Sequence, residues 1–299
     1  MRSLAAALAS SFTVAGFAVS AGPANARSLR SGAACAATVT RDVPYESIQG
    51  VDPVLLSLDV SPVAGNCGAP VAVWVHGGGW RRGDKSNGEA AREAFYHAQG
   101  WVLVSVNYRL STDTVAPPVF YPDHNNDVAA ALAWIETNIA TYGGDPSKVV
   151  LIGHSAGARI AAALTADPSF LAGHDLDPAW LDCVVLLDSE GYEVSTMAAA
   201  NELYRNAFGD DPAVWVDASP SEHVGEGPLP AEILIVTRGR AERVARAQSF
   251  ADQLTAAGAD ARVVDVSPLS HADVNNFIGA GDNVMSALMI EELATCAAP

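Results

Sequence analysis

Short apolar runs alternate along the chain with longer stretches that have helical spacing. The apolar runs are continuous and end in polar or turn-forming residues, as strands buried on both faces do. We expect strands at residues 38–43, 55–60, 71–75, 101–106, 149–152, 183–187, 233–236 and 261–266. We expect helices at residues 88–98, 127–141, 242–257 and about 272–294. This alternation predicts an α/β fold, with a mostly parallel sheet of about eight strands and helices on both faces.

Three local features refine this layout. The strands at 38–43 and 55–60 predict an antiparallel pair, and Asp127 is a plausible N-cap for the helix that begins there. Residues 111–126 and 189–230 do not fit the alternation and are rich in Pro, Gly, Asp and Tyr. Each would leave the sheet at its carboxyl edge, where ligands bind in such folds. We therefore expect these two segments to form pocket walls or a small cap.

One apolar run ends in a serine turn. Residues 149–157 read Val-Val-Leu-Ile-Gly-His-Ser-Ala-Gly, and the next seven residues form a helix readily. A strand, a sharp turn with a central serine and a helix are the context of a nucleophile elbow. The five-residue pattern alone also fits an ordinary glycine-rich turn, so the rest of the chain must decide. If it is an elbow, Ser155 is the reactive residue and the chain is a hydrolase.

A second glycine-rich turn, His-Gly-Gly-Gly-Trp at residues 76–80, directly follows an expected buried strand. Backbone N–H groups stabilise the oxyanion of acyl transfer best where no Cβ blocks their approach. The turn stands about one strand–helix–strand unit before Ser155, where the glycine motif of lipases and esterases belongs. We expect the amides of Gly77, Gly78 and Ala156 to form the oxyanion hole.

These motifs, in this order, resemble the α/β-hydrolase superfamily. Within it they are similar to carboxylesterases with an HGGG motif, namely hormone-sensitive-lipase-like, feruloyl-esterase-like and kynurenine-formamidase-like enzymes. The matching segments are residues 76–80, 107–110, 142–146 and 153–157. The resemblance runs from about residue 40 to the C-terminus and is poor over 189–230. It implies a serine hydrolase that cleaves carboxylic esters through an acyl-enzyme and requires no metal or organic cofactor.

The resemblance also implies positions for the base and the acid. The base of the family follows the last strand, where His271 stands among seven histidines in the chain. The acid usually follows the strand before last, as Gly-x-x-Asp, and here Glu242 stands three residues after Gly239. Glu242 is the expected acid, although it could instead be an exposed helix residue favoured by the helix dipole. Asp188 is the rival, because some members of the fold take the acid from the strand that ends there.

Two other functions fit the same motifs less well. An amide-bond hydrolase of the formamidase or peptidase kind would use the same three catalytic residues. An inert binding protein on this fold would usually lack the serine or the histidine, and both are present here. The expected partner is therefore an ester, either a small molecule or one carried on a polymer.

The net charge and the N-terminal segment limit the expected binding partners and the expected location of the protein. The chain has 34 acidic and 17 basic residues, so its net charge of −17 argues against binding to nucleic acid or to an anionic membrane surface. A basic start, an apolar stretch and Ala-Asn-Ala at residues 24–26 predict a secretory signal peptide at residues 1–26. We expect a secreted or periplasmic protein in which residues 27–299 form one domain.

The four cysteines fit that setting. None lies in a CxxC pair, so disulfide bonds are favoured over a metal site in an oxidising compartment. Three pairings are possible. Cys35 precedes one expected strand and Cys67 follows the next, so a hairpin would bring them together and leave Cys183 to pair with Cys296.

Overall fold

The computed structural model describes residues 38–112 and 118–297, which lie within one compact unit, Cys35–Pro299. The expected signal peptide, residues 1–26, lies outside the described residues, and so does Cys35 of the expected Cys35–Cys67 pair. Across the described part of the chain, every helix is too short or too polar to cross a bilayer.

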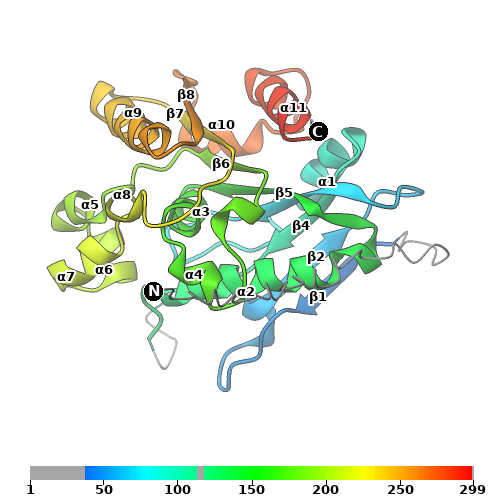
Figure 1. The fold of residues 1–299 in the computed structure, drawn as a ribbon, viewed down its shortest axis with the longest axis horizontal. Helices are drawn as coiled ribbons and strands as arrows, with labels where there is room; N and C mark the ends of the chain where they lie inside the picture. Colours follow the sequence, from blue (N-terminus) through cyan, green and yellow to red (C-terminus); the bar gives the residue numbers. More distant parts are fainter. Residues whose placement is uncertain (1–37, 113–117, 298–299) are drawn as a thin grey trace, which may run out of the picture. The chain divides into compact units, whose positions relative to one another are not determined.

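The described residues contain one eight-stranded sheet in the order β1-β2-β4-β3-β5-β6-β7-β8 (Figure 1). The strands are β1 Thr40–Pro44, β2 Ser57–Ser61, β3 Ala69–Val75, β4 Val102–Val106, β5 Gly144–His154, β6 Cys183–Leu187, β7 Glu232–Thr237 and β8 Asp260–Asp265. The six strands from β4 to β8 in this order run parallel, while β2 is antiparallel to both β1 and β4. This confirms the predicted fold class and the antiparallel first pair.

Helices cover both faces of the sheet because its central strands alternate between two apolar cores. In β3, Val71, Val73 and Val75 face one core, while Ala72 and Trp74 face the other. The first core is closed by α2 (Asp123–Asn138), α3 (Ala156–Ala166) and α9 (Ala241–Ala256). The second is closed by α1 (Glu89–Ala98), α10 (His271–Asn276) and α11 (Val284–Cys296). A disulfide joins Cys183 to Cys296, which confirms that predicted pair.

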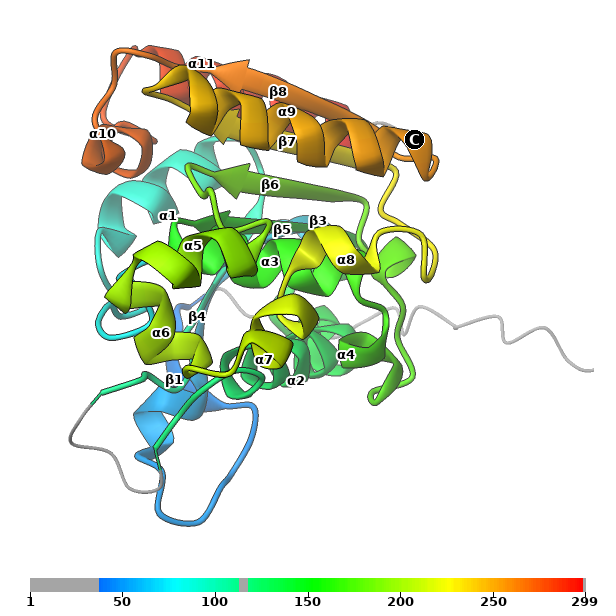
Figure 2. The ribbon, with the colours of Figure 1, turned by 90° about the vertical axis from the view of Figure 1, so that its left-hand side faces the viewer.

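The segment between β6 and β7 is helical rather than irregular. It contains α5 (Val194–Ala200), α6 (Glu202–Phe208), α7 (Pro212–Asp217) and α8 (Pro220–His223), which gather together beside α3 (Figure 2). Asp211 and Ser219 each precede a proline at the first helical position, and the Asp211 side chain accepts a hydrogen bond from the Ala213 amide. A cap followed by proline begins a helix as readily as it begins a turn, and helices this short lack a readable period.

Two helix boundaries also differ from the prediction. Helix α2 begins at Asp123, and the carboxylate of Asp127 accepts hydrogen bonds from the amide and guanidinium of Arg109 instead of capping. The helix expected over 272–294 is divided into α10 and α11. Asn283 starts α11 by accepting hydrogen bonds from two amides of its first turn. A further short helix, α4 (Ser169–Ala172), follows α3.

Candidate active site

Ser155 stands at the turn from β5 to α3 in the strained geometry of a nucleophile elbow. Its backbone has φ 56° and ψ −115°, which a non-glycine residue rarely adopts. A Cβ atom on Gly153 would lie 2.3 Å from the Gly157 carbonyl oxygen, and one on Gly157 would lie 2.2 Å from that of Val75. Both glycines are therefore needed for α3 to pack this close to the sheet.

The glycine loop, residues 76–80, passes directly beside Ser155. A Cβ atom on Gly77 would lie 3.0 Å from the Ser155 Cβ, so the loop backbone touches the serine. Gly78 has φ +121°, and a Cβ atom there would lie 1.8 Å from the Arg82 carbonyl oxygen. Ala156 is the first residue of α3. The structure thus brings Gly77 and Ala156 next to the serine and leaves no room for a side chain at Gly78.

His271 joins the serine to a carboxylate. Its Nε2 atom lies 2.9 Å from the Ser155 Oγ, and its Nδ1 atom lies 2.6 Å from the Asp188 Oδ2. His271 begins α10, where Ser270 and Asp273 form a reciprocal capping box. This cap fixes the backbone that carries the imidazole.

The prediction that Glu242 orients His271 is wrong, because Asp188 holds that position. Asp188 directly follows β6, the neighbour of the strand that carries Ser155, and its side chain is fully buried. A left-handed backbone, φ 54°, directs it after the strand ends. Glu242 is exposed in the first turn of α9, which is the alternative placement that the sequence left open.

Asp188 is surrounded by cations. Arg238 Nε lies 2.6 Å from its Oδ2, and Arg243 Nη2 lies 2.5 Å from its Oδ1. Burial alone would raise the pKa of this carboxyl. The hydrogen bond with His271 and the charges of Arg243 and Arg238 outweigh burial and lower the pKa to about 2. The carboxylate is therefore ionised at any ordinary pH and can stabilise a positive charge on His271.

The segment at 107–110 supports the glycine loop, a role that its sequence did not reveal. The Tyr108 hydroxyl donates to the His76 carbonyl at 2.9 Å, and its ring stacks on the His76 imidazole. Asn107 accepts from the Lys85 amide at 2.6 Å and donates to an Asp84 oxygen at 2.9 Å. The order of polar and aromatic residues gave no sign of these partners, which lie more than 20 positions away.

The helical segment after β6 lies over the glycine loop. Trp80 packs edge-on against Tyr204 and Phe208, with ring centroids 5.2 and 5.1 Å apart. The Leu203 side chain fills the space above Gly79. Helix α6 therefore packs against the glycine loop through these apolar side chains.

Two groups of described residues have the spacing of metal ligands, and both are already engaged. Cys183 and Cys296 form the disulfide within the first group. In the second, His223 uses one ring nitrogen on Glu226 and the other on the Asp217 carbonyl. Neither group includes Ser155, His271 or Asp188.

Several known proteins that are similar to this chain are named as esterases. The BD-FAE family matches residues 58–173, a stretch that includes both glycine motifs. Esterase LipQ of Mycobacterium tuberculosis is 31% identical over 75% of this chain and 54% of LipQ. The chain belongs to the α/β-hydrolase esterase family. A second relative of this α/β-hydrolase, the probable carboxylic ester hydrolase LipM of the same organism, is 29% identical over 75% of the chain and 53% of LipM.

The chain spans about half the length of these curated relatives. Among solved structures, the α/β-hydrolase superposes on esterase B of Lactobacillus rhamnosus with a TM-score of 0.68 at 20% identity, covering 87% of this chain and 84% of that one. It superposes on the apo form of Thermogutta terrifontis esterase 2 with a TM-score of 0.66 at 23% identity, covering 88% and 96%. At this identity the superpositions show the shared fold.

Proposed function

We propose that this chain hydrolyses carboxylic esters through an acyl-enzyme intermediate formed on Ser155. The observation that carries the proposal is the position of His271, within hydrogen-bond distance of both the Ser155 Oγ and the Asp188 Oδ2. A serine, a base and an orienting carboxylate in this arrangement form the catalytic triad of serine hydrolases. The names of LipQ and LipM, an esterase and a probable carboxylic ester hydrolase, support an ester as the substrate.

The steps follow from the geometry. Ser155 Oγ attacks the ester carbonyl while His271 Nε2 takes its proton, and the proton then passes to the departing alcohol. Water repeats the sequence on the acyl-enzyme and releases the acid. Asp188 holds the Nδ1 proton of His271 and stabilises the imidazolium that forms in each half of the reaction.

The oxyanion that forms in each step would be bound by backbone amides. Gly77 and Ala156 lie beside Ser155, and Gly78 extends the same loop. Donors fixed before the reaction need no reorganisation as the charge develops, and each is worth about 10²–10³ in turnover. Tyr108 supports the first residue of this loop, because its hydroxyl donates to the His76 carbonyl and its ring stacks on the His76 imidazole.

The test is Ser155→Ala with a short 4-nitrophenyl ester as substrate. We expect turnover to fall by about 10⁵–10⁶, as in other serine hydrolases that lose the nucleophile. Circular dichroism should show an unchanged fold, and a fluorophosphonate probe should label only the wild type. Retained activity or retained labelling in the variant would overturn the proposal.

We also propose that the protein is exported from the cell. This part of the proposal depends only on the expected signal peptide at residues 1–26. A cleaved signal peptide would leave Arg27 as the first residue of the mature chain. Mass spectrometry of the protein recovered from its producing cells should find this N-terminus. Recovery of the uncleaved chain in the cytoplasm would contradict export without affecting the chemistry.

A further inference from the structure

A cavity of about 230 Å³ lies beside the glycine loop, on the side of the sheet covered by α1 and α10. Its walls include Trp74 of β3 and His76, which directly follows β3. His154 of β5, Arg92 of α1 and Asn275 of α10 also line it. The backbone of the glycine loop and the exposed side chain of Arg82 complete it. We call it the arginine cavity.

The guanidinium of Arg92 is buried in this cavity without a carboxylate. The residue is 3% exposed, and its Nε atom has no hydrogen-bond partner among the described residues. One nitrogen, Nη2, donates to the Asn87 carbonyl, and the guanidinium carbon lies 4.5 Å from the centre of the Trp74 ring. These contacts hold the group in place but do not neutralise its charge, and a buried charge without a counter-ion is unfavourable.

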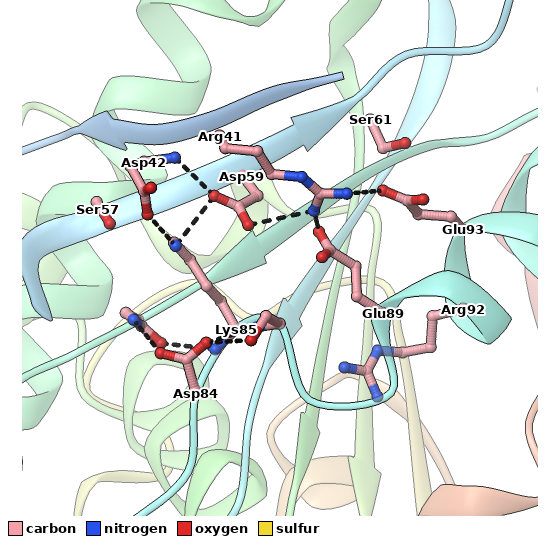
Figure 3. Close-up of polar contacts among 12 residues, drawn as sticks. Arg41, Asp42, Ser57, Asp59, Ser61, Asp84, Lys85, Glu89, Arg92 and Glu93 are labelled. Carbon is pink, nitrogen blue, oxygen red and sulfur yellow. Dashed lines mark hydrogen bonds and ion pairs between the residues drawn. The ribbon is translucent and has the colours of Figure 1, made fainter. Parts of the chain in front are cut away.

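Both acidic residues of α1 form ion pairs with another cation. Glu89 lies one turn before Arg92 on α1, but its carboxylate pairs with Arg41, as does that of Glu93 (Figure 3). Figure 3 also shows the Arg92 side chain extending away from this network. The other cation of the network, Lys85, contacts Asp42 and Asp59. These four carboxylates are therefore paired with cations other than Arg92, and the Asp84 carboxylate accepts hydrogen bonds from Ser86 and Asn107.

The lining itself contains no acidic residue within the described part of the chain. In a protein with 34 acidic and 17 basic residues a buried arginine has many potential partners, yet none of them lines this cavity. The two histidines in the wall add no positive charge at neutral pH, because burial lowers the pKa of His76 and of His154 to about 4. The fixed charges at the cavity are thus those of Arg92 and Arg82.

The cavity is separated from Ser155 by only one residue. Gly77 lines the cavity, and a Cβ atom on it would lie 2.9 Å from the His154 Nδ1 and 3.0 Å from the Ser155 Cβ. His154 directly precedes the serine, and its Nε2 atom donates to the carbonyl of His271. An anion in the cavity would therefore lie close to the reacting ester, on the far side of Gly77.

We propose that the arginine cavity is an anion subsite that binds a carboxylate carried by the ester substrate. Arg92, with Arg82 at the rim, would supply charged donors, and Asn87 and Asn275 would supply amide donors. A guanidinium binds a carboxylate through two parallel hydrogen bonds, which adds geometric specificity to the attraction. This inference rests on the proposed esterase function and defines its substrate class as esters that bear a free acid.

The test compares matched neutral and anionic esters. Mono-4-nitrophenyl glutarate and 4-nitrophenyl pentanoate have acyl chains of equal length and differ in a terminal carboxylate. A second pair, 4-acetoxybenzoate and its methyl ester, carries the carboxylate on the alcohol side. In the wild type we expect kcat/KM to favour the anionic member of at least one pair, after subtraction of the uncatalysed rate. The pair that shows the preference identifies which part of the ester carries the anion.

The variants Arg92→Met and Arg82→Gln should then lower the ratio of anionic to neutral kcat/KM. For Arg92→Met we expect a fall of about 10- to 100-fold, mainly through KM, as expected for the loss of a hydrogen-bonded charge pair. Arg82→Gln alters an exposed side chain, so it tests the site even if Arg92→Met fails to fold. Lys148→Gln removes one positive charge from an exposed position of β5, six residues before His154 and outside the cavity lining, and is the matched control, with an unchanged ratio.

Each outcome has a distinct meaning. If neither ester of either pair is hydrolysed, the proposed function fails. If all are hydrolysed but the wild type shows no anionic preference, or if Arg82→Gln and a folded Arg92→Met leave the ratio unchanged, the subsite is overturned while the esterase stands. If free glutarate inhibits hydrolysis of the pentanoate ester but neither anionic ester is preferred, the cavity binds a free anion and the substrate assignment is overturned.

Discussion

Two charged regions lie on opposite sides of the Ser155 strand, and they differ in how completely their charges are matched. At the end of β6, the Asp188 carboxylate has two arginines and His271 around it. The arginine cavity lies on the other side of β5, near the end of β3. There the buried guanidinium of Arg92 forms no ion pair with a carboxylate of the described residues. Both groups are nearly inaccessible to solvent, so burial does not explain the difference.

This difference in charge pairing indicates different roles for the two regions. The region around Asp188 positions a residue of the protein itself, whereas the region around Arg92 is arranged for a ligand. Asp188 is fully partnered because its task is to hold an internal group, His271, in one orientation. Arg92 is held by Trp74 and Asn87 but not neutralised, as expected of a residue whose counter-ion arrives from outside. Functional sites often retain such locally unfavourable groups at a cost in stability.

Asp188→Asn should produce the largest effect, because it breaks the fully partnered region. The carboxylate can only accept a hydrogen bond from the Nδ1–H group, whereas the amide NH2 can donate one to Nδ1, so the variant favours the wrong tautomer of His271 and kcat should fall by about 10⁴. Steady-state kinetics with a neutral ester measures this. Glu242→Gln is the matched control and should change kcat by less than about twofold, since surface changes of this kind have small effects. The reverse ranking would restore Glu242 as the acid.

Gly77→Ala tests the wall that the two regions share. The added methyl group would lie 2.9 Å from the His154 Nδ1 and 3.0 Å from the Ser155 Cβ, so the glycine loop must move. We expect a loss of about 10²–10³ in kcat, because an oxyanion donor moves away from the reacting carbonyl. Gly173→Ala is a useful control for glycine substitution, because a Cβ atom there meets nothing within 4 Å and its φ of −62° suits alanine. Equal activity of the Gly77 variant and the wild type would remove Gly77 from the oxyanion hole.

These regions also show where sequence reasoning succeeds and where it fails. The elbow and the glycine loop can be predicted because their constraints are local: a buried strand, then glycines wherever a Cβ would collide. The acid that orients His271 could not be chosen from sequence. Asp188 and Glu242 follow two parallel strands, and both strands end at the same edge of the sheet. What decides is the backbone after β6, where φ at Asp188 is 54°. Arg92 gave no signal either, because its isolation depends on Arg41, which contacts Glu89 from 48 positions away.

The next effect concerns stability and compares one arginine from each region. Arg243→Met removes a partner of the buried Asp188 and should lower the free energy of unfolding by about 1–3 kcal/mol. Arg92→Met removes a buried charge that has no counter-ion, so it should change that free energy by less than about 1 kcal/mol or raise it. Urea unfolding measures both. If the two variants lose equal stability, the charge of Arg92 is matched in the free protein and the contrast fails.

The smallest effect is a difference in acid sensitivity between the two regions. The pKa of His76 and of His154 is about 4 in the folded chain, because burial disfavours the charged ring, against about 6.5 when unfolded. Between these values the unfolded chain binds more protons, so stability falls as the pH drops from 6.5 towards 4. The contribution of Asp188, with a pKa of about 2, is present above 3.8 and is lost only as the pH falls towards 2.

Urea unfolding at pH 7 and pH 5 should therefore show a loss of more than about 1 kcal/mol in the wild type. It comes from the buried rings of His76, His154 and His124, the last with a pKa lowered by burial to about 3, rather than from Asp188. The loss should be smaller in His154→Gln, which removes one of the rings that must stay neutral. His97→Gln is the matched control, because this histidine is only half-buried and lies at the end of α1, away from the cavity lining. If His154→Gln and His97→Gln reduce the loss equally, acid sensitivity is not concentrated around the arginine cavity.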